Sequence, residues 1–380
     1  MKQRNILLVI QPAYPERIQG IARFARAHDW HLTIVDRLAR FPRGWRGDGA
    51  LVTLRGNAET NRFVKGLARD GIPVVDLTFN HPEIRLPRVS GDHESFGRLA
   101  RQHFESLNFH HFAWFSTSWS HVHELRYFGF THGDKPPDTL EKWVFNEMVP
   151  AAKIDDWPLF LLKLGKLLKS SPKPLAILAY DDADAAKVLS AALEAGLKVP
   201  EDIAIIGIGN DAVICENQAV PLSSVNHDLE RNGYEGAALL DKLMSMPLKP
   251  SKPPAPLLLS PRGIVIRKST DTLAADDPLL TAALKEIASR LDTSFGIDDL
   301  ARALHVSRKR LDRLFSEKFS RSVGKEIARQ RLERAKRLLT ETDKQMKEIA
   351  GLCGFCNAGH FTNVFRVAMG VTPKEYRKRH

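Results

Sequence analysis

The feature that most constrains this chain is a change of pattern close to residue 267. Before it, short apolar runs rich in β-branched residues alternate with segments whose apolar residues recur at helical spacing; after residue 278, only helical spacing remains. Strand–helix alternation is typical of parallel sheets with helices on both faces. Because about 265 residues exceed one comfortable doubly wound sheet, we predict an α/β fold with two lobes, followed by an all-α domain.

The join between these regions is rich in proline and polar residues. Six prolines lie in residues 247–261, and residues 267–277 are mostly polar, as expected of a closing loop and an interdomain linker. We predict a first domain over residues 1–268, a linker over 269–280 and a second domain over 281–380. Doubly wound sheets bind ligands at the carboxyl ends of their strands, so we expect a ligand cleft between the two lobes.

Charge is concentrated in the second domain. The chain has a net charge of +11, whereas residues 301–380 alone carry 20 Lys and Arg against 8 Asp and Glu, or +12, which leaves −1 for the first 300 residues. A basic end on a neutral body favours a polyanionic partner, nucleic acid foremost. A solvated basic surface gives the same count, so charge alone does not decide between the two.

Residues 297–315 have the pattern of a helix-turn-helix. Leu300, Ala301 and Leu304 give a first helix one apolar face, and a short turn follows. Ser307 is a good N-cap for a second helix whose apolar residues recur at positions i, i+3 and i+4. The second helix of such a motif enters the major groove, where arginine can bond guanine. The residues that we predict to contact DNA here are Ser307, Arg308, Lys309, Asp312 and Arg313.

The same design recurs about 50 residues later. The apolar pair at 349–350 repeats the pair at 300–301, and Gly354 suits a turn position with positive φ, the place held by His305 in the first copy. Between the copies, residues 322–341 predict a helical spacer about 25 Å long. The second recognition helix is predicted over 357–369, with DNA contacts from Asn357, Ala358, His360, Thr362, Asn363 and Arg366.

Residues 281–380 resemble the DNA-binding domain of the AraC/XylS family, in which a helix joins two helix-turn-helix units. The resemblance rests on the run RLERAKRLL at 331–339 and on GVTPKEYR at 370–377. It implies binding to a double-stranded DNA operator and a role in transcription regulation, with RNA polymerase as a further partner.

Residues 1–267 resemble the LacI/GalR type of periplasmic-binding-protein-like sensor. The matching runs are RYFGF at 126–130, DDADA at 181–185 and GLKVPEDIAIIG at 196–207. The resemblance implies a small carbohydrate effector, a homodimer, and a cleft arginine and acid that match Arg126 and Asp181. We also predict ligand contacts from Tyr14 and Asn210. Gly209 stands where sugar-binding relatives commonly carry aspartate, which leaves the identity of the sugar open.

Several residues have a second interpretation. Asp181 also suits the start of a helix, where acids cap and complement the helix dipole, and Arg126 also suits a surface ion pair. The run from Gly207 to Ala212 fits a dinucleotide fingerprint without a clean following helix. Cys353 and Cys356 have the spacing of half a zinc site, and histidines cluster at 110–123, but ligand sets are incomplete. We predict no metal and no cofactor.

These patterns together predict a sequence-specific DNA-binding transcription regulator whose activity is set by a small carbohydrate bound between two sensor lobes. Three cysteines are too few for a disulfide framework and no run of 18 apolar residues occurs, so we expect a cytoplasmic protein without a membrane partner. Two alternatives stay open: a ligand-independent DNA-binding protein with a degenerate sensor, and a sugar-processing enzyme fused to a DNA reader. We predict no enzymatic activity, because the sequence lacks a nucleophile–base pairing or a phosphate loop. The operator sequence, and activation against repression, stay open.

Overall fold

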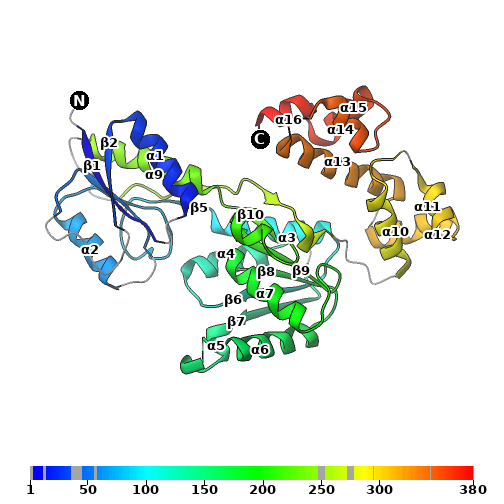
Figure 1. Ribbon diagram of the computed structural model, residues 1–380, viewed down its shortest axis with the longest axis horizontal. Helices are drawn as coiled ribbons and strands as arrows, with labels where there is room; N and C mark the ends of the chain where they lie inside the picture. The colour runs from blue at the N-terminus through cyan, green and yellow to red at the C-terminus, as the bar shows by residue number, and fades with distance from the viewer. Residues whose placement is uncertain are drawn as a thin grey trace. The chain divides into compact units, whose positions relative to one another are not determined.

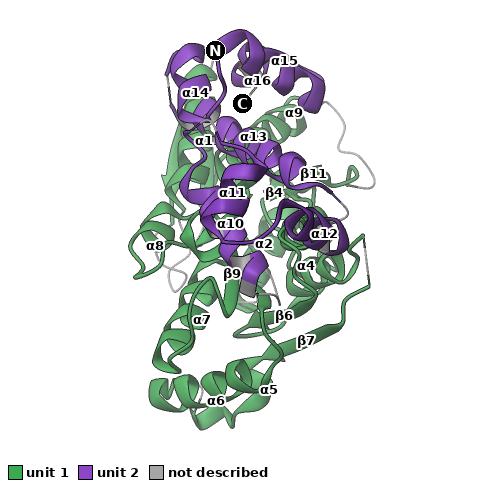
Figure 2. Cartoon of the chain, turned by 90° about the vertical axis from the view of Figure 1, so that its right-hand side faces the viewer, with its two compact units in different colours: residues 1–272 green, residues 273–380 purple. Residues whose placement is uncertain are grey.

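The computed structural model describes residues 3–11, 14–35, 45–54, 58–134, 136–153, 155–246, 253–271, 278–293, 295–319, 321–342 and 344–379. Contacts divide the chain into two compact units, residues 1–272 and 273–380, coloured separately in Figure 2. The first unit is α/β and the second is all-α, which confirms the predicted fold class. Within the described residues, no helix combines the length and the apolar character needed to cross a membrane.

The first lobe of the first unit is built on a four-stranded parallel sheet with the order β2-β1-β3-β4. Strands β1 and β3 are buried almost throughout, as expected where helices cover both faces of a sheet. The elements of this lobe are β1 (Arg4–Val9), α1 (Pro15–Ala27), β2 (Trp30–Ile34), β3 (Gly49–Val52), α2 (Ala58–Arg69), β4 (Val74–Asp76) and α9 (Leu229–Met244), which returns to pack on α1.

The second lobe is built on a six-stranded sheet with the order β12-β10-β9-β8-β6-β7, parallel except for β12. Figure 1 shows α3 and α4 on one face of this sheet and α6 and α7 on the other. Its elements are α3 (His93–Ser106), β6 (His111–Ser116), α4 (His121–Thr131), β7 (Thr139–Val144), α5 (Phe145–Met148), η1 (Ala151–Lys153), α6 (Trp157–Ser170), β8 (Leu175–Ala179), α7 (Asp182–Glu194), β9 (Ile203–Gly209), α8 (Ala212–Glu216), β10 (Ser223–Asn226), β12 (Ile264–Val265) and η2 (Lys268–Thr270).

The chain passes between the lobes at three places. It leaves the first lobe after β5 (Val89–Gly91), returns between β10 and α9, and crosses again between β11 (Leu257–Leu259) and β12. Strands β5 and β11 pair in parallel, so two of the crossing segments run side by side. Both sheets end their parallel strands near these crossings, which places a cleft where the sequence predicts one.

The second unit consists of helices around two small apolar cores. One core joins α10, α11 and α12 through residues such as Leu284, Leu300 and Phe315; the other joins α13 to α14 and α15 through residues such as Ala335 and Phe361. Helix α13 spans 19 residues, about 28 Å, and links the two helix-turn-helix pairs. The helices are α10 (Pro278–Ser289), α11 (Ile297–Ala303), α12 (Arg308–Phe319), α13 (Val323–Glu341), α14 (Met346–Leu352), α15 (Ala358–Met369) and α16 (Pro373–Arg379).

Both ends of the predicted linker, residues 269–280, belong to elements that the structure describes. Ser269 and Thr270 are buried in the first unit, where their hydroxyls form hydrogen bonds, and Pro278 already begins α10. Residues 272–277 lie outside the described residues. The polar side chains of 269 and 270 resemble a linker in sequence because their long-range partners cannot be recognised there.

Candidate ligand cleft and DNA-binding helices

A cavity of about 330 Å³ lies between the two lobes of the first unit, at the carboxyl ends of strands from both sheets. Side chains from each lobe line it, including Tyr14 and Asn80 from the first, and Arg126, Asp181 and Asn210 from the second. The structure therefore brings together all four predicted ligand residues, which span almost 200 positions of the sequence. That they contact a ligand stays a prediction.

Arg126 is buried on α4, and residues of other elements hold its guanidinium. Its Nε donates to Nδ1 of His93 at 3.3 Å, and its Nη1 donates to the carbonyl oxygen of Tyr180, whose ring lies 4.6 Å from the guanidinium carbon. Helices α3 and α4 cross closely here, since a Cβ on Gly97 would lie 2.0 Å from the carbonyl oxygen of Arg126. With only 5% of Arg126 exposed, the alternative of a surface ion pair is wrong.

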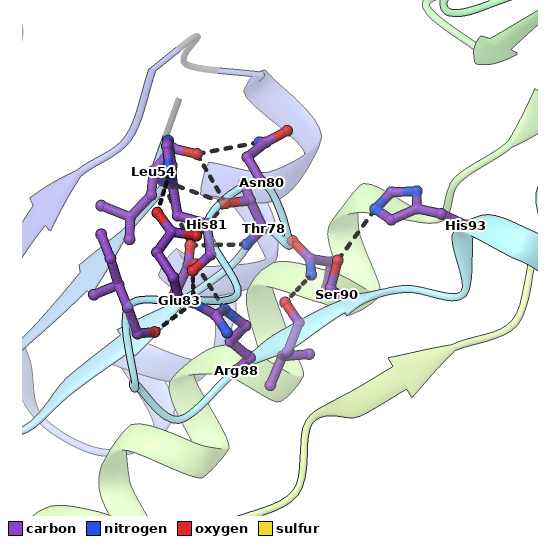
Figure 3. A network of polar contacts seen from close by, with 12 residues as sticks. Leu54, Thr78, Asn80, His81, Glu83, Arg88, Ser90 and His93 are labelled. Carbon is purple, nitrogen blue, oxygen red and sulfur yellow. Dashed lines mark hydrogen bonds and ion pairs between the residues drawn. The ribbon is translucent and has the colours of Figure 1, made fainter. Parts of the chain in front are cut away.

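His93 fixes the direction of this arginine as a neutral ring. A guanidinium can only donate, so Nδ1 of His93 must accept this hydrogen bond. The proton of the neutral imidazole then lies on Nε2, which faces Oγ of Ser90 at 3.3 Å (Figure 3). Burial holds the pKa of His93 well below its usual value, and the charge of Arg126 lowers it further. His93 was missed in the sequence, because its partners come from β5 and α4.

Asp181 fits both of its predicted interpretations. It caps α7, with Oδ1 accepting the N–H of Asp184 at 2.9 Å, and it also lines the cavity. The cap uses only one carboxylate oxygen. Burial raises the pKa of Asp181, and the nearby Asp184 raises it further, while Arg126 and Lys187 oppose this.

Asp182 supplies a second cleft carboxylate, although it is not one of the four predicted ligand residues. Its Oδ1 accepts the hydroxyl of Ser224 at 2.5 Å and its Oδ2 accepts the N–H of Asp211 at 2.8 Å. Burial raises the pKa of Asp182 to about 6, despite these hydrogen bonds. The carboxylate thus ties the start of α7 to β10 and to the residues that directly follow β9.

The glycines at the end of β9 make room for this carboxylate. A Cβ on Gly207 would lie 2.3 Å from Oδ1 of Asp182, and one on Gly209 would lie 2.9 Å from Oδ2. Gly209 also has a φ of +143°, which disfavours any side chain. The dinucleotide-like spacing therefore has a packing explanation, and the helix after it, α8, is only five residues long.

Asn210 and Tyr14 are far apart in the sequence but border the same cavity. Asn210 has a φ of +60°, donates its N–H to Oγ of Ser224 at 2.9 Å, and accepts from Arg267 at 3.0 Å through Oδ1. Tyr14 directly precedes α1, and the guanidinium of Arg17 lies 5.8 Å from its ring. Arg17, which sequence reasoning missed, is 3% exposed and also lines the cavity.

A buried ion pair holds the loop that brings Thr78 and Asn80 to the cavity (Figure 3). Nε of Arg88 lies 3.0 Å from Oδ2 of Asp76, and Thr78 donates its hydroxyl to Oδ1 of Asp76 at 2.8 Å. Burial raises the pKa of Asp76 and the charge of Arg88 opposes that effect. Asn80 donates to the carbonyl oxygen of Leu54 at 3.1 Å, which fixes the cleft end of the loop.

The first recognition helix, α12, exposes most of its predicted DNA residues. Ser307 caps it by accepting the N–H of Arg310 at 3.2 Å, and His305 in the preceding turn has a φ of +53°, as predicted. Arg313 lies 2.7 Å from Glu317, an exposed pair that solvent screens strongly. Arg308 is exposed and forms ion pairs with Asp298 and Asp312. Lys309 is also exposed, whereas Asp312 is half-buried.

The second recognition helix, α15, begins after Asn357, whose Oδ1 accepts the N–H of His360 at 2.8 Å. Gly354 in the turn has a φ of +67°, as predicted, and a Cβ there would lie 2.6 Å from the carbonyl oxygen of Leu291. Asn363 and Arg366 are exposed and contact each other at 3.4 Å, whereas Ala358 and Thr362 are half-buried.

Cys353 and Cys356 lie in different surroundings. Cys353 is buried in the apolar core, while Cys356 is exposed with its Sγ 3.2 Å from Nδ1 of His360. Among the described residues, no group of three metal-ligating side chains comes together.

Comparison with known proteins supports both units. Residues 102–270 match the model of a periplasmic binding protein-like domain, and residues 300–379 match that of a helix-turn-helix domain. The xylose operon regulatory protein of Escherichia coli K12 is 25% identical, with 98% of this chain and 96% of that protein covered. The chain is a DNA-binding transcription regulator that combines a periplasmic binding protein-like domain with a helix-turn-helix domain.

Other relatives agree with this family. The xylose operon regulatory protein of Haemophilus influenzae Rd is 28% identical over 77% of the regulator and 75% of that protein. Among solved structures, the xylose-binding transcription activator xylR matches with a TM-score of 0.59 at 23% identity, covering 100% of the regulator and 99% of that chain. The cellobiose complex of the transcriptional regulator CelR matches with a TM-score of 0.55 at 20% identity, covering 70% and 85%. These relatives are transcription regulators and not enzymes.

Arg313→Ala should weaken binding to a selected DNA site by about tenfold or more and relax the preference at one base pair. The guanidinium can leave the screened pair with Glu317 to bond a guanine edge. Fluorescence anisotropy on the selected duplex and on single-base variants measures both effects.

Arg290→Ala is the matched control, since it also removes one half of an Arg–Glu pair four residues apart, but at the end of α10, where Arg290 directly follows the helix that holds Glu286. It should leave the base preference unchanged. Equal losses for Arg313→Ala on selected and random DNA would show that Arg313 touches only phosphate.

Proposed function

We propose that a small carbohydrate, xylose or a related sugar, binds between the two lobes and sets the DNA binding of the regulator. The observation that carries this proposal is the convergence of Tyr14, Arg126, Asp181 and Asn210 from both lobes on one cavity. Carboxylates accept hydrogen bonds from sugar hydroxyls, and guanidinium and amide groups donate to hydroxyl and ring oxygens. The relatives named for xylose support this class of effector.

Closure of the two lobes is the conformational change that a ligand bound in this cleft would favour. Asp181 and Arg126 belong to the second lobe and Tyr14 to the first, so a sugar between them gains its full set of contacts only when the lobes are close. A ligand shifts an equilibrium only by the difference in its affinity for the two states. The sugar therefore favours the closed state and changes the population of the DNA-binding form.

DNA recognition is assigned to the second unit. In the proposal, residues 1–268 sense the sugar and residues 281–380 bind a double-stranded operator, with α12 and α15 in the major groove. A homodimer formed through the sensor places two such units on a repeated site. RNA polymerase is the proposed further partner, and the cytoplasm is the proposed location.

Calorimetry on the full chain with D-xylose, L-arabinose, D-ribose and D-glucose tests the proposal. We expect one pentose to bind tightest and to change the affinity for a duplex selected from random DNA. If no sugar binds and adding sugar leaves the DNA affinity unchanged, the ligand-independent alternative is favoured. Recovery of a chemically altered sugar after incubation would favour the enzyme alternative.

A further inference from the structure

The segment by which the chain leaves the first unit is bonded to a cleft residue. Nη2 of Arg267 donates to Oδ1 of Asn210 at 3.0 Å, and Nη1 donates to the carbonyl oxygen of Leu222 at 3.0 Å. Asn210 lines the cavity, while Arg267 directly precedes η2. From η2 the sequence continues into the DNA-binding unit, so Arg267 lies on the covalent path between the two proposed functions.

Asn210 depends on its neighbours for its conformation. It has a φ of +60° and follows Gly209 at +143°, two consecutive residues in the region of positive φ. Asparagine enters this region more readily than most side chains, and the surrounding structure can fix it there. Two hydrogen bonds do so: the N–H of Asn210 to Ser224, and the guanidinium of Arg267 to its side chain.

The exit segment, residues 267–270, is anchored on β10, the strand whose residues also form hydrogen bonds to cleft residues. Oγ of Ser223 on β10 accepts the N–H of Arg267 at 2.8 Å and lies 2.7 Å from Oγ1 of Thr270. Ser269 accepts the N–H of Ser223 at 2.9 Å. Ser269 and Thr270 are 0% and 1% exposed, so the exit segment is anchored by buried residues.

Ser224, the next residue of β10, forms hydrogen bonds on the cleft side of the strand. Ser224 donates its hydroxyl to Asp182, the buried carboxylate that lines the cavity, and accepts the N–H of Asn210. Adjacent serines of β10 therefore bond the cleft on one side and the exit segment on the other. Arg267 connects the two sets directly.

We propose that Arg267 is a positioning residue that couples occupation of the cleft to the segment leading into the DNA-binding unit, an inference that rests on the proposed function. A sugar bonded to Asn210 changes the energy of the bond between Asn210 and Arg267. Because the same guanidinium holds Leu222 and its own backbone is fixed by Ser223, that change alters how the exit segment is anchored. Coupling of this kind is a free-energy difference between two sites, with typical effects of about 5–150-fold.

The test uses the full chain with Arg267→Met, which keeps an unbranched apolar stem and removes every side-chain donor. DNA affinity is measured with and without a saturating concentration of the sugar that binds the wild type tightest in the panel above. We expect the ratio of the two DNA affinities to fall to about 1, from the wild-type value of roughly 5–150. Sugar affinity, measured by calorimetry, should change by less than about tenfold, since Arg267 does not line the cavity.

Two further variants make the result specific. Glu216→Gln removes the negative charge from the third partner of the same guanidinium. The side chain of Glu216 is 61% exposed, so this variant should keep the wild-type ratio. Arg267→Lys keeps the charge but cannot hold Asn210 and Leu222 together, so it should lower the ratio; it decides the question if Arg267→Met does not fold. A wild-type ratio in the Arg267 variants at saturating sugar overturns the proposal, as does an equal loss in Glu216→Gln. If the wild type itself shows no response to any sugar, the proposed function fails, and this inference fails with it.

Discussion

Raising the NaCl concentration from 50 to 200 mM is expected to weaken DNA binding by the full chain by about 10³-fold or more. Residues 301–380 carry a net charge of +12, and two recognition helices with their flanking residues can neutralise about six to ten phosphates. Each neutralised phosphate releases condensed counterions, so the logarithm of the binding constant falls with the logarithm of salt at a slope of about −0.9 per phosphate. Fluorescence anisotropy at five salt concentrations gives this slope.

The slope also tests which unit binds DNA. Removing a basic residue of the second unit that touches phosphate should reduce the slope by about one. Removing a basic residue of the first unit, such as the exposed Arg69, should leave it unchanged. A flat salt dependence, or a slope governed by residues of the first unit, would contradict the assignment of DNA binding to the second.

Features fixed by local chemistry could be predicted from the sequence. Both helix-turn-helix units were found because caps, apolar spacing and turn residues lie within about 20 positions of one another. Ser307 and Asn357 cap their helices, and His305 and Gly354 take up the expected positive φ. The alternation of strands and helices likewise gave the class of the first unit.

Features that depend on distant residues could not be predicted. The buried ion pair of Asp76 with Arg88, and the neutral ring of His93 against Arg126, join elements whose contact follows only from the tertiary fold. Residues 269 and 270 looked like a linker for the same reason, since Ser223, their partner, lies over 40 positions earlier. A sequence pattern indicates the chemical character of a residue, but it does not identify the distant residues that the residue contacts in the fold.

Gly209 shows how such a contact changes an interpretation. In the sequence it is a missing aspartate, and therefore a lost sugar contact. In the structure, the carboxylate of Asp182 occupies the space beside it, with Oδ2 2.9 Å from where a Cβ would lie. An acidic group is thus present at the end of β9 after all, although it comes from α7. Because Asp182 bonds both Ser224 and Asp211, it acts on the shape of the cleft through them.

Asp181→Ser should weaken sugar binding by about 30-fold or more and remove the response of DNA binding at ordinary sugar concentrations. A carboxylate in a closed cleft can accept two hydroxyls, and hydrogen bonds to charged groups contribute about 1.5–3 kcal/mol each. Serine keeps an oxygen that can cap α7 in place of Oδ1, so helix α7 should retain its start. Calorimetry with the tightest-binding sugar gives the affinity, and DNA binding without sugar should stay at the wild-type level.

Asp156→Ala provides the matched control for the loss of a capping acid. Asp156 caps α6 by accepting the N–H of Leu159 at 2.9 Å and does not line the cavity. Its removal should lower the free energy of unfolding by about 1 kcal/mol and leave sugar affinity unchanged. Should Asp181→Ser bind sugar as tightly as the wild type, Asp181 has only its capping role. Should Asp156→Ala weaken sugar binding equally, the effect at Asp181 reflects stability and not contact, because the two acids share only their place at the start of a helix in the second lobe.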